Sequence, residues 1–119
     1  MQAVVTGGAS GIGLGQLVRC AQEGMIPVCL DINEDAMLQA AKTLRDAGAE
    51  QVLTLLCDVG NREAVFETAA TIKQHFPDTP ISYLAANAGF GTPSILDGDE
   101  AGWRRGVDVL MCESLLLLT

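Results

Sequence analysis

Residues 6–13 read Thr-Gly-Gly-Ala-Ser-Gly-Ile-Gly, directly behind the apolar run Ala3-Val4-Val5 and in front of a helix-like stretch. Glycine supplies the positive φ that a tight strand-to-helix turn needs. A side chain at position 11 would hold an anion away from the backbone amides, and glycine at 13 lets the helix lie close on the strand. Because helix N-termini favour anions, the stretch predicts a phosphate-binding turn. A merely flexible glycine-rich turn is the alternative.

The next strand supports the first interpretation. Residues 25–30 are apolar enough for a buried parallel strand, and they end in Asp31, at the spacing from Gly13 where a βαβ unit presents an acid to the ribose of an adenine dinucleotide. A carboxylate accepts hydrogen bonds from both ribose hydroxyls and repels a 2′-phosphate. No Arg or Lys occurs in 7–15 or 31–39 to offset that repulsion, so NAD is favoured over NADP. The alternative role for Asp31 is an N-cap of the next helix, for which Asn33 is better suited.

The rest of the chain repeats this unit. Apolar residues at helical spacing predict a helix that Gly48 ends; they are Met37, Ala40, Ala41, Leu44 and Ala47. Residues 51–57 read as a third strand, 61–76 as a helix that ends before two prolines, and 81–86 as a fourth strand. Strands that alternate with helices at this length predict a parallel sheet with right-handed crossovers.

These residues resemble the short-chain dehydrogenase/reductase family over roughly 1–110. The family's first motif is Thr-Gly, followed after three residues by Gly-x-Gly, and it matches residues 6–13. Its adenine-side Asp-Val matches Asp58-Val59, and its Asn-Ala-Gly matches residues 87–89. The resemblance implies that Asp58 contacts the adenine amino group, that Val59 contacts the ring, and that 87–89 hold the fourth strand against the first turn beside the ribose. A purely structural role for Asn87 is the alternative. The implied cofactor-binding set is Gly7, Ser10, Gly11, Ile12, Gly13, Asp31, Ile32, Asp58, Val59, Asn87, Ala88 and Gly89.

The family's catalytic groups have no counterpart. Its members use a tyrosine, a lysine four residues later, a serine and an asparagine. Here the single tyrosine, Tyr83, is followed four residues later by Asn87, the lysines Lys42 and Lys73 match no such spacing, and Leu110 stands where the resemblance places the asparagine. We therefore expect Tyr83 to be a packed aromatic of the fourth strand and no catalytic residue in this chain.

Composition excludes several classes of function. Fifteen acidic against seven basic residues give a net charge of -8, which disfavours nucleic acid and anionic membranes. The leucines at 115–118 are far too few for a membrane span. The four cysteines have no paired short spacing, and His75 is the single histidine, which argues against a zinc site. We expect His75 to be a solvated residue at a helix end. Thiols in predicted core elements and the absence of a secretory leader predict a reducing, cytoplasmic location.

We thus expect one domain over 1–119, an α/β fold equal to half of a Rossmann-type doubly wound sheet, in strand order 3-2-1-4 with helices on both faces. The fourth strand should present an open edge. Two functions remain open. One is a truncated form of an NAD-dependent oxidoreductase that acts on a carbonyl or secondary alcohol. The other is a non-catalytic nucleotide-binding or dimerisation module that forms homo- or hetero-oligomers through a helix at 103–118. The sequence does not predict the substrate.

Overall fold

The computed structural model describes residues 1–88 and residue 101. Strands and helices alternate as predicted, in the order β1 (Gln2–Thr6), α1 (Gly11–Gln22), β2 (Ile26–Asp31), α2 (Glu34–Asp46), β3 (Leu53–Leu56), α3 (Arg62–His75) and β4 (Ile81–Ala86). The third strand is shorter than the 51–57 expected from its sequence, and the helix expected over 61–76 is shorter by one residue at each end.

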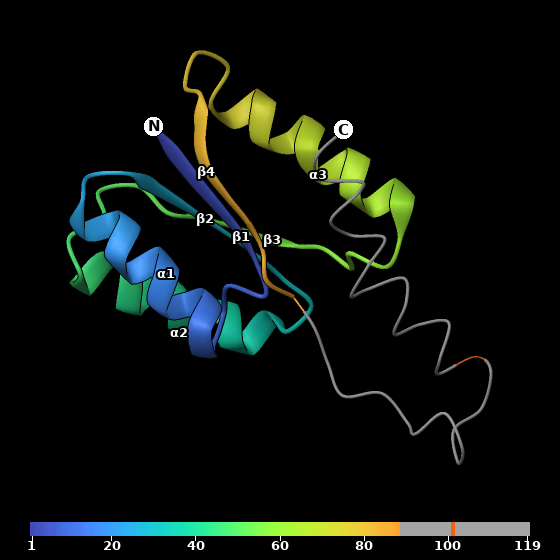
Figure 1. Ribbon diagram of the computed structural model, residues 1–119, viewed down its shortest axis with the longest axis horizontal. Helices are drawn as coiled ribbons and strands as arrows, with labels where there is room; N and C mark the ends of the chain where they lie inside the picture. The colour runs from blue at the N-terminus through green and yellow to red at the C-terminus, as the bar shows by residue number, and fades with distance from the viewer. Residues whose placement is uncertain (89–100, 102–119) are drawn as a thin grey trace.

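The four strands form one parallel sheet in the order β3-β2-β1-β4, which confirms the predicted topology. Helices α1 and α2 cover one face, and α3 covers the other (Figure 1). Because successive side chains of a strand point to opposite faces, β1 contributes side chains to the core on both faces of the sheet. Ala3 and Val5 pack with Leu17 of α1 in one core cluster, and Val4 packs with Val65 of α3 in the other.

Local sequence signals set the helix ends. The side chain of Asn33 accepts a hydrogen bond from the backbone N–H of Ala36 at 3.0 Å, so Asn33 is the N-cap of α2 as predicted. Asn61 caps α3 in the same way through the N–H of Ala64. Gly48, the predicted stop of α2, has φ +109°, which an L-residue with a side chain rarely adopts.

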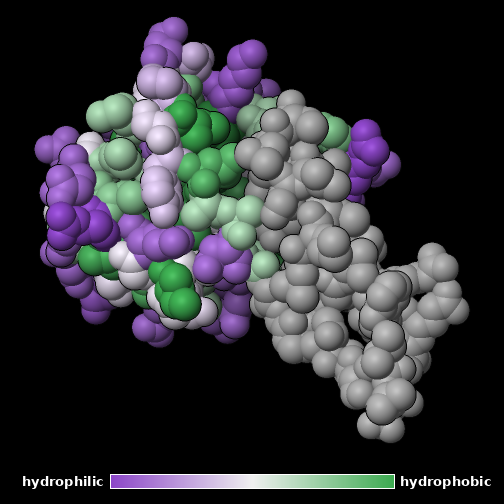
Figure 2. All heavy atoms as spheres, viewed as in Figure 1, coloured by the Kyte–Doolittle hydropathy of each residue, from purple (hydrophilic) through white to green (hydrophobic). Residues whose placement is uncertain are grey.

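Within residues 1–88, the strand β4 lies at the edge of the sheet and pairs with β1 alone. Figure 2 shows hydrophobic surface where Figure 1 places β4. Tyr83 lies in this strand as expected, but 37% of it is exposed, so its prediction as a packed aromatic is wrong. The physical reason is that β4 lies at the edge of the sheet formed by residues 1–88, where it pairs with β1 alone. His75 is an exposed last residue of α3, as predicted.

Candidate functional site: a glycine-rich turn at the carboxyl edge of the sheet

The turn between β1 and α1 requires glycine at two positions. Gly7 has φ +65° and Gly11 has φ +56°, both in the left-handed region. A Cβ at Gly11 would meet nothing within 4 Å, so the backbone there borders open space. An anion can therefore approach the first amides of α1, which begins at Gly11. The side chain of Ser10, the N-cap residue, makes no capping hydrogen bond.

Gly13 is required because of what surrounds it. A Cβ built on it would overlap the carbonyl oxygen of Gly7 and come within 2.6 Å of Nδ2 of Asn87. A Cβ on Gly7 would likewise lie 2.9 Å from Cα of Ala88. The close approach that the sequence predicted at Gly13 thus exists, and its partners are the turn itself and the residue after β4.

The end of β4 is tied to this turn by three hydrogen bonds. The buried hydroxyl Oγ1 of Thr6 accepts from the backbone N–H groups of Asn87 and Ala88, each at 3.0 Å. Nδ2 of Asn87 donates to the carbonyl oxygen of Gly7 at 3.3 Å. The structural role of Asn87 that the sequence left open is therefore present. Thr6 was missing from the expected set, although it opens the Thr-Gly motif. Gly89, which belonged to that set, lies outside the described residues.

Asp31 joins the end of β2 to the same turn. Its Oδ2 accepts from the backbone N–H of Ala9 at 3.1 Å, and its Oδ1 accepts from those of Ile32 at 2.7 Å and Asn33 at 3.1 Å. Because Asn33 caps α2, the alternative role of Asp31 as that cap is wrong. The carboxylate instead places a negative charge beside the glycine-rich turn. The contact to Ala9 joins residues 22 positions apart, and no sequence pattern indicated it.

The segment after β3 completes this edge of the sheet. Oδ1 of Asp58 accepts from the backbone N–H of Gly60 at 3.0 Å. Val59 is only 5% exposed and packs in the core cluster on the α3 face. Exposed apolar side chains nearby come from other positions: Ile12 at the start of α1, Ile32 after β2, and Leu56, which pairs with Asp31 across the two strands. The sequence predicted Ile12 and Ile32 here but not Leu56.

Cys29 lies beneath the turn as a neutral thiol. It is fully buried on β2, and burial, followed by the charge of Asp31, raises its pKa to about 12. A neutral buried thiol is a poor nucleophile. Among residues 1–88 and 101, no three His, Cys, Asp or Glu side chains are grouped so that they could hold a metal ion. None of the helices in this part of the chain combines the length and hydropathy of a membrane span.

Comparison with known proteins agrees with this geometry. A family model described as "short chain dehydrogenase" matches residues 1–118. The chain belongs to this family. It is 34% identical over 89 residues to human epidermal retinol dehydrogenase 2, a match that covers 75% of this chain and 28% of that protein.

Solved short-chain dehydrogenase structures share the fold. An NAD+-bound xylitol dehydrogenase superimposes with a TM-score of 0.87 at 28% identity, over 98% of this chain and 44% of that one. The L-sorbose reductase of Gluconobacter frateurii, complexed with NADPH, gives 0.85 at 25% identity over the same shares. The chain spans less than half the length of these relatives. The cofactor of this family's fold is thus a nicotinamide dinucleotide, either NAD or NADP.

The described residues of this family member contain no tyrosine beside the turn. Tyr83 pairs with Ala3 in the body of the sheet, and it precedes by three residues the strand end that meets the turn. Leu110, which stands in place of the expected asparagine, and the expected partner helix at 103–118 lie outside the described residues.

Proposed function

We propose that residues 1–119 form the NAD-binding domain of a short-chain oxidoreductase that interconverts a carbonyl and a secondary alcohol. The observation that carries the proposal is the carboxylate of Asp31, held against the N–H of Ala9 at the turn. Bound NAD supplies the hydride acceptor or, once reduced, the donor. This chain's residues bind and orient it. Amides at the start of α1 would take the pyrophosphate, and Asp31 would accept from the ribose hydroxyls.

The preference for NAD follows from charge. A 2′-phosphate would lie near the Asp31 carboxylate, and neither 7–15 nor 31–39 contains a lysine or arginine to neutralise it. The Ala9 amide, a donor that could otherwise reach a phosphate, is already bonded to the carboxylate. The exposed apolar side chains of Ile12 and Ile32 support the rest of the proposed cofactor site. Asp58 would lie on its adenine side. Val59, Ala88 and Gly89 complete the proposed set.

Catalysis would need groups that this sequence does not contain. The tyrosine and lysine implied by the family resemblance have no counterpart at the required spacing, so we propose that the 119-residue chain binds cofactor without turning over substrate. The buried thiols of Cys20 and Cys29 support a reducing compartment, and we propose the cytoplasm.

Titration calorimetry on the purified chain tests the cofactor site. NAD should bind saturably and NADP poorly. Asp31→Ala should weaken NAD binding by about 10-fold or more, because it removes charge-assisted hydrogen bonds of roughly 1.5–3 kcal/mol. The matched control Asp46→Ala removes the same charge from the exposed end of α2 and should leave binding unchanged. If a folded chain binds neither dinucleotide, the proposal fails. Equal binding of NAD and NADP would overturn the preference.

A second candidate function is a non-catalytic module that pairs with another chain. The observation in its favour is the exposed edge of β4, where Ile81 is 51% and Leu84 is 37% exposed. The predicted contact helix at 103–118 would contribute to that pairing. Sedimentation velocity distinguishes the candidates: a defined oligomer at low protein concentration supports the module, and a monomer that binds NAD excludes it.

A further inference from the structure

One exposed apolar side chain beside the proposed cofactor site comes from the strand next to Asp31. Leu56 is the last residue of β3, and 58% of it is exposed. In the parallel register of β2 and β3, Leu56 pairs with Asp31, and the backbone N–H of Cys57 donates to the carbonyl oxygen of Asp31 at 3.0 Å. Paired strands lie about 5 Å apart, so Leu56 is the immediate neighbour of Asp31 on the side away from β1.

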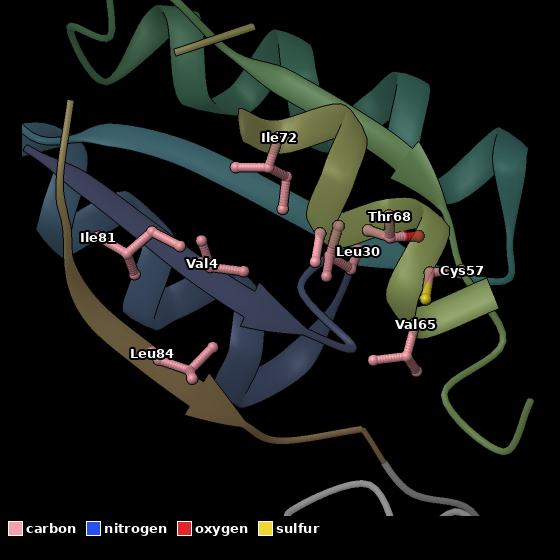
Figure 3. A pocket seen from close by; sticks show the side chains of 9 residues that line it. Val4, Leu30, Cys57, Val65, Thr68, Ile72, Ile81 and Leu84 are labelled. Carbon is pink, nitrogen blue, oxygen red and sulfur yellow. The ribbon is translucent and has the colours of Figure 1, made fainter. Parts of the chain in front are cut away.

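The side chains of Asp31 and Leu56 lie on the same face of the sheet. An apolar hollow of about 110 Å³ lies beneath α3 on the other face, and Leu30 and Cys57 contribute to its lining (Figure 3). Because successive side chains of an extended segment alternate between faces, Asp31 and Leu56 lie on the face that α1 and α2 cover. Cys29, two residues before Asp31, agrees with this, since it packs in the core cluster on that face.

The carboxylate of Asp31 therefore has a different neighbour on each side. On the β1 side, its Oδ2 accepts from the backbone N–H of Ala9 in the glycine-rich turn. On the β3 side lies Leu56. A dinucleotide whose pyrophosphate takes the amides at the start of α1, and whose ribose bonds to Asp31, would run from the turn toward β3. The 2′ position of its adenosine would then lie on the Leu56 side of Asp31.

The charges of the surrounding segments are acidic. The stretch 46–61, which contains β3, has no lysine or arginine, like the stretches 7–15 and 31–39. The first turn of α2 adds two acids, Glu34 and Asp35. A 2′-phosphate would thus meet carboxylates at this place, and none of the three segments would supply a cation.

We propose that Leu56 is a specificity-determining residue of the cofactor site. Its uncharged side chain occupies the position from which a cation could reach a 2′-phosphate beside Asp31, and it offers apolar contact to the adenosine of NAD instead. The role of Leu56 rests on the proposed function, since it adds a residue of β3 to the selection of NAD by Asp31. An arginine at this position would reverse the effect, because a guanidinium binds phosphate through paired, charge-assisted hydrogen bonds.

Replacing Leu56 by arginine tests this role. In titration calorimetry on the 119-residue chain, Leu56→Arg should raise the affinity for NADP relative to that for NAD by about 10-fold. The gain should shrink at high ionic strength, because salt screens an exposed ion pair. The matched control Gln51→Arg adds the same charge to an exposed residue before β3 and should leave the ratio unchanged. The two positions lie roughly 16 Å apart along the strand, about twice the Debye length at physiological salt.

The possible failures are distinguishable. A folded Leu56→Arg chain that binds NAD with an unchanged ratio would overturn the role of Leu56 and leave the proposed function intact. An equal rise in Gln51→Arg would also overturn it, because net charge alone would then explain the change. If Leu56→Arg does not fold, as judged by far-ultraviolet circular dichroism, Leu56→Lys supplies the charge on a slimmer side chain and the same outcomes apply. Binding of neither dinucleotide by the folded, unmodified chain would overturn both the role of Leu56 and the proposed function.

Discussion

Replacing Gly13 by alanine should destabilise the fold, whereas the same replacement at Gly15, two residues further along α1, should stabilise it. The two positions lie in the same helix, α1, and differ only in the atoms that surround them. A Cβ at Gly13 overlaps the carbonyl oxygen of Gly7 and lies 2.6 Å from Nδ2 of Asn87, whereas a Cβ at Gly15 meets nothing within 4 Å. The pair therefore separates the cost of crowding from the ordinary helix propensity of alanine.

The magnitude follows from these contacts. Overpacking against groups that cannot move freely costs about 1–3 kcal/mol. Displacing Asn87 also removes its 3.3 Å hydrogen bond to Gly7, worth about 1 kcal/mol. Alanine gains roughly 0.5–1 kcal/mol over glycine in a helix, and because both positions lie in α1 this gain cancels between the two variants. The free energies of unfolding of the two variants should thus differ by about 2–4 kcal/mol.

Urea unfolding followed by far-ultraviolet circular dichroism measures this difference. With a slope of about 2 kcal/mol per molar urea for a domain of this size, the two midpoints should lie about 1–2 M apart. Gly13→Ala should also weaken NAD binding, because it displaces the turn, and Gly15→Ala should not. Equal stability of the two variants, or a more stable Gly13→Ala, would refute the packing argument.

Two further predictions concern the turn and the thiol beneath it. Thr6→Val leaves two part-buried backbone N–H groups after β4 without their acceptor, so the free energy of unfolding should fall by about 2–4 kcal/mol in urea titrations. The control Thr43→Val, which removes an exposed bond within α2, should change it by less than about 0.5 kcal/mol; equal losses would contradict the role of Thr6. The raised pKa of Cys29 means that the folded state binds more protons than the unfolded state between pH 9 and about 12, so stability should fall as pH rises through that window. Cys29→Ala should lessen that fall in urea midpoints measured across alkaline pH, and an unchanged pH dependence would show that this thiol does not contribute.

Most of the fold followed from local patterns in the sequence. The apolar runs predicted β1, β2 and β4, because buried parallel strands need no alternation of polar residues. Glycine or asparagine at helix ends predicted where α2 stops and which residue caps its start, because these signals act through the backbone of the same segment. The third strand was overestimated, since propensity does not show where pairing with β2 ends.

The candidate site was predicted in outline. Glycine at 7 and 13 and the acid at 31 were recognised from spacing, and the structure places all three around one turn. The sequence missed the hydroxyl of Thr6 and the amide of Ala9, whose partners lie far along the chain. It also misjudged Tyr83, since burial of a strand residue depends on which strands flank it.

By itself, the sequence determined the order of strands and helices, the glycine-rich turn with its helix start, and membership of a dinucleotide-binding class, because each depends on contacts between residues close along the chain. The family resemblance implied that residues 87–89 lie against the turn, but only the tertiary structure decided which groups bond there. The amide of Ala9 donates to Asp31, and the amides of Asn87 and Ala88 donate to the hydroxyl of Thr6. The tertiary structure alone also decided that an apolar hollow opens beside α3. These features arise where strands distant in sequence become neighbours, and the pairing of β1 with both β2 and β4 is what brings them together.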